Sequence, residues 1–419
     1  MRAVLSLLRR PATGALVGQG TQAVAGLALQ VAAARELGPA GLATFSVVYG
    51  AIVLATAVCS GLVGDSLTVL DRHAPGIRAG LHVGAVLVSG GAALIGLVLG
   101  VTTDVVPAWA GLVLGAATAA FILEDTLRRL LMATGRFWSL PVVDGTTLVL
   151  ALGWLVVAGT VGELTISTFL AALLAGQTGA ALVAWVLLPA GERPSGPWRR
   201  PALGEVAAFG VWRATAQTIR PALLTALRLL VIGVAGAAAY GPLEVARVYT
   251  APALVLVAGM GSFLLPHFVS IRGRGPAAGL RAADRAAAGL ALGVALIGLV
   301  AVGAMPWLAP LLTAGAYAVP VVAVVGWSVY AAASALLLPY SSLASVHGRQ
   351  RRVLAFRCLE FGSLAGVLLL LLLADDAAVW APLVLAGGPA LTALAVRRWV
   401  LSPGDRDGEG RAVAVPVGG

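Results

Sequence analysis

Hydrophobic residues along this chain occur in long runs that short polar stretches interrupt. A helix needs about 20 consecutive apolar residues to cross the hydrocarbon core of a bilayer. The pattern therefore predicts an all-α polytopic membrane protein with about 12 transmembrane helices. The first six predicted spans are 13–34, 42–70, 80–102, 107–133, 140–160 and 165–189, and the second six are 205–235, 243–270, 286–304, 316–346, 353–374 and 379–397.

One polar stretch is longer than the others and divides the spans into two sets of six. It reads PAGERPSGPWRRPALGE and is rich in proline, glycine and charge, as linkers are. The predicted units are an N-terminal six-helix lobe at 1–189, a cytoplasmic linker at 190–204, a C-terminal six-helix lobe at 205–398 and a disordered cytoplasmic tail at 399–419.

Composition and charge agree with this class. Hydrophobic residues make up 59% of the chain, charged residues 11%, and the mean hydropathy is +0.96, values that exclude an ordinary soluble domain. All 28 basic residues are arginine, and the 12-span pattern places 23 of them inside and two, Arg35 and Arg247, outside. This asymmetry predicts a multi-pass plasma (inner) membrane protein with both termini in the cytoplasm, and it explains the net charge of +10 without nucleic-acid binding.

The other three arginines lie inside the seventh span, in VWRATAQTIRPALLTALRLLVIG. At 100° per residue, Arg213, Gln217, Arg220 and Arg228 fall within an arc of about 80° on one helix face. An arginine facing lipid at mid-bilayer costs about 2.5 to 3.5 kcal/mol, so this face is predicted to line a polar cavity. Pro221 frees the carbonyl of Gln217 and is a candidate hinge.

The chemistry of arginine favours an anionic ligand in that cavity. Its planar guanidinium donates paired hydrogen bonds to phosphate or carboxylate, so several arginines suit a pyrophosphate. Residues 27–61 align with 227–261 at nine identical positions, which makes the first span equivalent to the seventh. The first span carries Gln19, Gln22 and Gln30, whose amides would bind sugar hydroxyls or join neighbouring helices.

Acidic residues within the spans are few. Glu124 and Asp125 precede Arg128 and Arg129 by four residues, which predicts two intrahelical ion pairs.

Asp65 and Asp144 lie near predicted inner helix ends. Either would couple a proton or pair with Arg213, although anchoring at the membrane interface is the commoner role. The spacing of histidines, cysteines, serines and acids matches neither a metal site nor a catalytic triad. We therefore expect neither catalysis nor a cofactor.

The stretch ARELGPAGLATFSVVYGAIVLATAVCSGLVGDSL, residues 34–67, resembles the polysaccharide-flippase branch of the multidrug/oligosaccharidyl-lipid/polysaccharide (MOP, MATE-like) exporter superfamily. The shared features are Leu37, Gly38, Pro39 and Gly41 in the first outer loop, followed by an aromatic-rich helix. Similar passages are GVAGAAAYGPLEVARVYTAPALVLVAGMGSFLLPHF, TAGAY and HGRQRR in the second half.

The resemblance implies two pseudo-symmetric six-helix lobes around a central cationic cavity. It implies a transporter that flips an undecaprenyl-pyrophosphate-linked oligosaccharide from the inner to the outer leaflet by alternating access. Arg213, Arg220 and Arg228 would hold the pyrophosphate, and Gln217 with the first-span glutamines would contact sugar or backbone. We expect a monomer acting beside glycosyltransferases or a polymerase of the same pathway.

Three alternatives remain open. A cation-coupled multidrug or small-molecule exporter would share the architecture, although such exporters often carry an acid in the first helix, where this chain has glutamines. A membrane glycan polymerase or transferase would usually need carboxylates or a large outer loop. A scaffold for envelope assembly would transport nothing.

Overall fold

The computed structural model describes residues 11–103, 106–194, 196, 198–374 and 376–401. The first half contains α2 (Pro11–Glu36), α3 (Gly38–Cys59), η1 (Ser60–Gly64), α4 (Asp65–Val69), α5 (Pro75–Thr102), α6 (Ala108–Ala133), η2 (Phe137–Ser139), α7 (Leu140–Gly159), α8 (Ile166–Leu187) and η3 (Ala190–Glu192). The second half contains α9 (Leu203–Ala235), α10 (Ala237–Val248), α11 (Ala251–Ser270), η4 (Arg272–Arg274), α12 (Pro276–Thr313), α13 (Val321–Val346), α14 (Gln350–Arg357), η5 (Cys358–Phe361), α15 (Gly362–Leu373), η6 (Ala377–Trp380), α16 (Ala381–Leu385), α17 (Gly387–Ala395) and η7 (Val396–Val400).

These elements confirm the predicted all-α polytopic membrane class. Among the described residues, ten helical stretches are long and apolar enough to cross a membrane. Each matches one predicted span, and the other two predicted spans correspond to α2 and to the pair α10 and α11.

The eighth span begins earlier than predicted. Gly236 has a φ of +90°, which glycine adopts readily, and α10 begins directly after it at Ala237 rather than at 243. Arg247 therefore lies inside α10, about 15 Å from the start of the helix at 1.5 Å per residue, rather than near the start of a span at 243.

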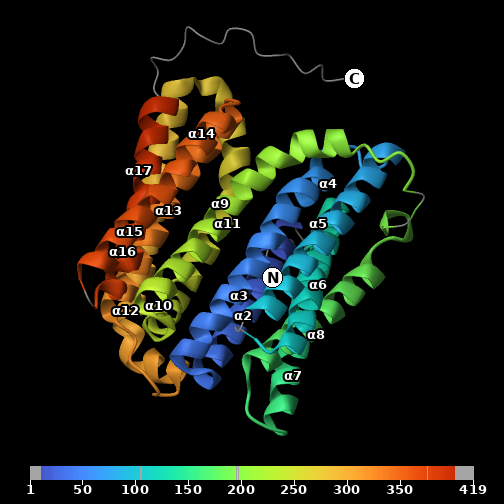
Figure 1. The fold of residues 1–419 in the computed structure, drawn as a ribbon. Coiled ribbons are helices and arrows are strands. Elements are labelled where there is room, and N and C mark those ends of the chain that lie inside the picture. Colours follow the sequence, from blue (N-terminus) through green and yellow to red (C-terminus); the bar gives the residue numbers. More distant parts are fainter. Residues whose placement is uncertain (1–10, 104–105, 195, 197, 375, 402–419) are drawn as a thin grey trace, which may run out of the picture.

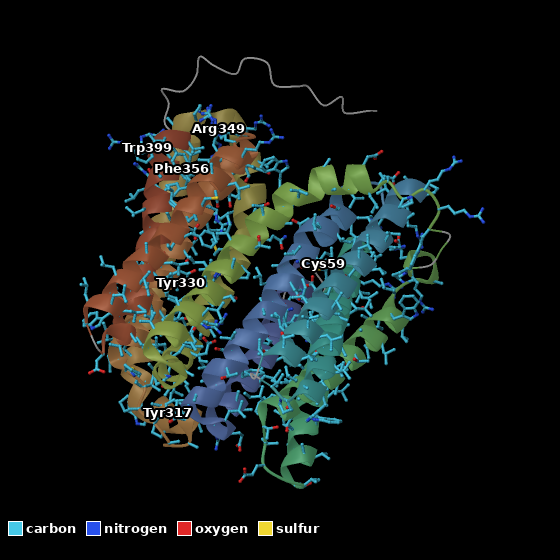
Figure 2. All side chains as sticks on the ribbon, in the orientation of Figure 1. Cys59, Tyr317, Tyr330, Arg349, Phe356 and Trp399 are labelled. Carbon is cyan, nitrogen blue, oxygen red and sulfur yellow. The ribbon has the colours of Figure 1, made fainter. Side chains whose placement is uncertain are left out.

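The two ends of the bundle differ in charge. Hydrogen bonds join the arginine-bearing loops at one end, for example Arg72 to Glu192 and Arg136 to the carbonyl of Leu187. Figure 2 shows Arg349, Phe356 and Trp399 at this end and Tyr317 at the other. We call the first the basic end; it is the end that the sequence predicts to be cytoplasmic.

Buried apolar side chains form three cores. One core, at the end opposite the basic end, contains residues from both halves, including Phe45, Leu227 and Trp327. At the basic end one core forms around Leu127 of the first half, together with Val206 of α9, and another forms around Phe268 of the second half. The halves thus share a core at one end and diverge toward the basic end, as the ribbon in Figure 1 shows.

Helix α9 lies between the halves. It packs along α3 and η1, and Gly61 and Gly210 permit close contact because a Cβ atom on either would collide with the opposing backbone. Farther along the helix, Leu223 and Val231 enter the shared core.

The domain boundaries remain predictions. The last helical element extends to Val400, two residues beyond the predicted end of the C-terminal lobe. Most of the predicted tail, from residue 402 onward, lies outside the described residues.

Candidate functional site

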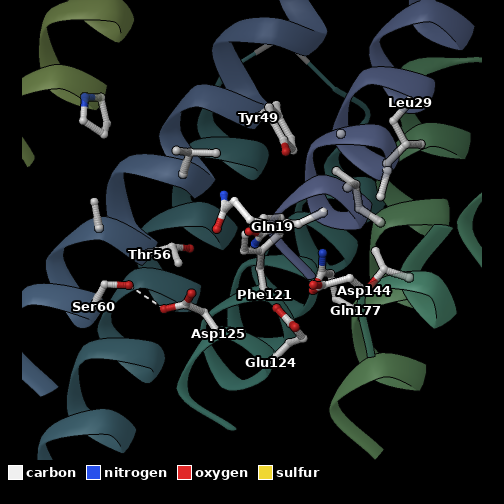
Figure 3. Close-up of a pocket in the computed structure, with 18 of the residues that line it drawn as sticks. Gln19, Leu29, Tyr49, Thr56, Ser60, Phe121, Glu124, Asp125, Asp144 and Gln177 are labelled. Atoms are coloured by element: carbon white, nitrogen blue, oxygen red, sulfur yellow. Dashed lines mark hydrogen bonds between the residues drawn. The ribbon is translucent and has the colours of Figure 1, made fainter. Parts of the chain in front are cut away.

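A central cavity lies between the first half of the chain and α9, and α10 and α11 also line its smaller region. It has two adjoining regions of about 620 and 440 Å³, a size typical of ligand sites. The residues that line both regions are Gln19, Gln22, Gly26, Tyr49, Val53, Arg220 and Pro221. Figure 3 shows the larger region, with side chains from the first half, among them Gln19, Tyr49 and Asp144, directed toward a common space.

Arg220 supplies the cavity with a guanidinium that no carboxylate neutralises directly. Within the described part of the chain it makes no ion pair or hydrogen bond, although the Glu360 carboxylate lies near enough to interact electrostatically. Pro221, the predicted hinge, lies beside it, and α9 continues through this proline without a break. Arg220 is therefore available to an anion in the cavity.

The predicted glutamines line the same cavity. Gln19 and Gln22 line both regions, and Gln30 lines the smaller one. None of the three amides bonds to another residue that the structure describes, so they do not join helices here. Gln217 lines the larger region but is engaged: its Nε2 donates to Asp65 Oδ2 at 2.9 Å.

The other two arginines of α9 have different surroundings from Arg220. Arg228 borders the smaller region, but it is buried and its Nη2 lies 3.3 Å from Glu244 Oε1. Glu244 is fully buried, with its second oxygen accepting a hydrogen bond from Tyr240, and it also pairs with Arg247. Arg228 thus has a carboxylate partner within the protein, which it shares with Arg247.

Arg213 does not line the central cavity. It borders a separate pocket at the basic end, and its Nε lies 3.4 Å from Asp65 Oδ2. The structure therefore does not bring all three arginines to one site. Helical spacing places the three side chains on one face of α9. The neighbours that this face meets change along the helix, so each arginine has different surroundings.

Asp65 on α4 contacts polar side chains from two other helices, α6 and α9. Besides Gln217 and Arg213, it lies 3.3 Å from Arg129 Nη1 on α6. Arg129 also pairs with Asp125 at 2.9 Å, as the i,i+4 spacing predicts. The predicted pairing of Asp65 with Arg213 is present.

The other predicted intrahelical pair is absent. Arg128 pairs instead with Asp144 on α7, at 3.0 Å from Nε to Oδ1, and both side chains are buried. Glu124 is 3% exposed, lines the larger region, and its Oε1 has no hydrogen-bond partner. Asp144, which also lines this region, thus pairs with Arg128 rather than with Arg213.

Among the described residues, no group of three or more His, Cys, Asp or Glu could hold a metal ion.

The sequence reasoning missed Tyr49 of this cavity and Glu244, which pairs with two arginines that line the smaller region. Tyr49 lines both regions, and its ring lies against Phe45 and edge-on to Phe121. Glu244 forms ion pairs with both Arg228 and Arg247, so one carboxylate serves two guanidinium groups. Signals for both existed, because Tyr49 aligns with Tyr249 in the repeat and Glu244 precedes Arg247 by three residues.

No protein-family model and no curated protein sequence matches this chain. Solved structures of similar fold do exist. An inward-facing multidrug resistance MATE family transporter of the MOP superfamily aligns with a TM-score of 0.66 and 17% identity over 90% of this chain and 93% of that one. An outward-facing MATE family transporter aligns with a TM-score of 0.59 and 14% identity over 93% of each chain.

A third structure is a MOP superfamily transporter from Pyrococcus furiosus, whose binding pocket of reverse polarity was taken to suggest a different function. It aligns with a TM-score of 0.57 and 16% identity over 93% of each chain. The chain therefore has the two-lobe helical fold of the MATE transporters.

Proposed function

We propose that this protein is a transporter that flips a lipid-linked oligosaccharide, carried on undecaprenyl pyrophosphate, from the inner to the outer leaflet for surface polysaccharide synthesis. The observation that carries the proposal is Arg220, whose guanidinium faces a central cavity without a direct carboxylate partner. An uncompensated arginine in a membrane interior is costly, and an anionic ligand offsets that cost.

The rest of the cavity suits a glycan attached to that anion. The amides of Gln19, Gln22 and Gln30 offer both donors and acceptors to sugar hydroxyls. Tyr49 adds an aromatic ring at the cavity wall. A pyrophosphate at Arg220 would thus leave its sugars beside polar and aromatic groups.

The proposed mechanism is alternating access. The halves share one core at the end opposite the basic end and diverge at the basic end, so the fold has a natural pivot. Structural neighbours have been observed in inward-facing and outward-facing conformations. With the basic end in the cytoplasm, the divergence would admit substrate from the inner leaflet of the plasma membrane.

A translocation assay tests this function. The purified protein would be reconstituted in vesicles with a fluorescent undecaprenyl-pyrophosphate-linked oligosaccharide, and outer-leaflet arrival would be measured. Loss of a charge-assisted contact at Arg220→Ala should slow translocation about 10-fold to 100-fold. The matched control is Arg398→Ala, an exposed arginine at the basic end. Unchanged translocation by Arg220→Ala would refute the site.

A second candidate, cation-coupled export of a small molecule, is favoured by Glu124. Its buried, unpartnered carboxylate oxygen beside the cavity is suited to exchange a proton or bind a cation. Efflux of a cationic dye driven by a proton or sodium gradient, lost in Glu124→Gln, would support this candidate. Vesicles that move the glycan lipid but no dye would eliminate it.

A further inference from the structure

A second pocket lies at the basic end, and its lining is rich in arginine. It shares no lining residue with the central cavity, has a volume of about 470 Å³, and lies between α9 and the adjoining ends of α13 and α14. Three arginines line it, Arg213, Arg351 and Arg357, with Gln350 and two serines. Its described lining contains no aspartate or glutamate.

The three guanidinium groups differ in how far the protein already neutralises them. Arg357 is engaged on two sides, by Glu360 at 3.1 Å and by the carbonyl of Ala216 at 3.0 Å. Arg213 pairs through Nε with Asp65 and remains 43% exposed. Arg351 makes no ion pair with any described residue, so the pocket carries uncompensated positive charge.

Aromatic rings orient two of these arginines. The guanidinium carbon of Arg351 lies 4.9 Å from the ring centroid of Trp212, and that of Arg213 lies 5.9 Å from the ring of Phe209. A cation held over a ring keeps its N–H groups free at the edge of the guanidinium plane. Both groups therefore retain donors for an anion.

The position of the pocket indicates that the anion is attached to a lipid. Trp212 is 49% exposed and Val69 is 56% exposed at the rim, beside the arginines of the basic end. Tryptophan and arginine together are typical of the level of lipid headgroups. A phosphate bound there would sit among the arginines while its acyl or prenyl chain remained in the bilayer.

We infer that this pocket is a phosphate-binding site for the headgroup of a lipid, where the lipid carrier docks before its headgroup reaches Arg220. The second part of the inference rests on the proposed function. Arg213 and Arg220 are seven residues apart on α9, about 10 Å along the helix axis. A headgroup could thus move along this face of α9 from Arg213 to Arg220 by a displacement of that order.

Binding of a lipid phosphate tests the site independently of transport. Native mass spectrometry would measure binding of dioleoyl phosphatidic acid, dioleoyl phosphatidylcholine and inorganic pyrophosphate to the full-length protein. We expect phosphatidic acid to bind best and Arg351→Gln to weaken its binding about tenfold. The matched control, Arg352→Gln, removes the adjacent arginine, which does not line the pocket, and should leave binding unchanged.

Three outcomes would count against the inference. Equal binding to wild type and Arg351→Gln, or equal losses in Arg351→Gln and Arg352→Gln, would overturn the site. Pyrophosphate binding as tightly as phosphatidic acid would retain the phosphate chemistry but overturn its lipid source.

The translocation assay separates this inference from the proposed function. If Arg351→Gln raises the lipid concentration needed for half-maximal rate and leaves the maximal rate unchanged, docking precedes translocation. If the wild-type protein moves no glycan lipid but still binds phosphatidic acid through Arg351, the proposed function fails and the site stands.

Discussion

Gln217 on α9 donates a hydrogen bond to Asp65 on α4 at 2.9 Å, although the two residues are 152 positions apart in the sequence. The bond joins the helix that carries the candidate ligand-binding arginine to the first half of the chain. Arg213 and Arg129 contact the same carboxylate, so Asp65 holds α9 against α4 and α6 at the basic end.

We predict that Asp65→Asn loosens this junction. The substitution removes the charge shared by two arginines, and we expect the free energy of unfolding to fall by about 1 to 3 kcal/mol, measured by equilibrium unfolding in mixed micelles. Asp71→Asn, an exposed aspartate six residues later, is the control. Equal stability of the two variants would show that the network contributes nothing.

The buried cluster around Glu244 yields a second prediction. Glu244→Gln leaves Arg228 and Arg247 without a counter-charge in the interior, and removing one partner of a buried pair costs about 3 to 5 kcal/mol. Adding Arg228→Gln should recover part of that loss, because it removes one of the uncompensated charges. Strictly additive losses in this double-mutant cycle would contradict the assigned pairing.

Substitutions at Asp144 and Glu124 test which of these two carboxylates pairs with Arg128. Because Arg128 pairs with Asp144, Asp144→Asn should lower the free energy of unfolding by about 3 to 5 kcal/mol. Glu124→Gln should change it by less than about 1 kcal/mol, since the Glu124 Oε1 atom has no partner to lose. If Glu124→Gln proved more destabilising than Asp144→Asn in the same unfolding measurement, the result would support an ion pair between Glu124 and Arg128 instead.

Glu192 of the predicted linker is bonded to Arg72, and we predict that this contact makes the stability of the protein depend on pH. Hydrogen bonds from Arg72 Nε and Nη2, at 3.1 and 3.2 Å, hold the pKa of Glu192 below its usual range. A lowered pKa in the folded state gives stability that is present above the unfolded pKa of about 4.3. That stability is lost as the pH falls through the folded value.

Wild type should therefore exceed Glu192→Gln in stability by up to about 1 kcal/mol at pH 7, and the difference should shrink as the pH falls from about 4.3 through the lowered pKa of Glu192. Thermal unfolding at a series of pH values measures this difference. Glu163→Gln, at an exposed glutamate in another loop, should show no such pH dependence. A difference between wild type and Glu192→Gln that is as large at pH 3 as at pH 7 would contradict the assignment to this carboxylate.

Local spacing predicted the contacts that lie within one helix. Asp125 and Arg129, both on α6, pair at i,i+4. The period of the helix fixes such neighbours before any tertiary packing forms. The same rule failed for Glu124 and Arg128, because Asp144 on the adjacent helix offers Arg128 a carboxylate in a buried position.

The sequence by itself determined that this protein is a bundle of membrane-crossing helices, because only helices satisfy their backbone hydrogen bonds in lipid and the length of each apolar run sets a span. It also determined that one face of α9 is polar. Only the tertiary structure decided which partner each charge on that face meets. Arg228 meets Glu244, Arg213 meets Asp65 beside a separate pocket, and Arg220 faces the central cavity. The physical reason is that charges in the membrane interior are stabilised by neighbours on other helices, and the packing of those helices sets the distances.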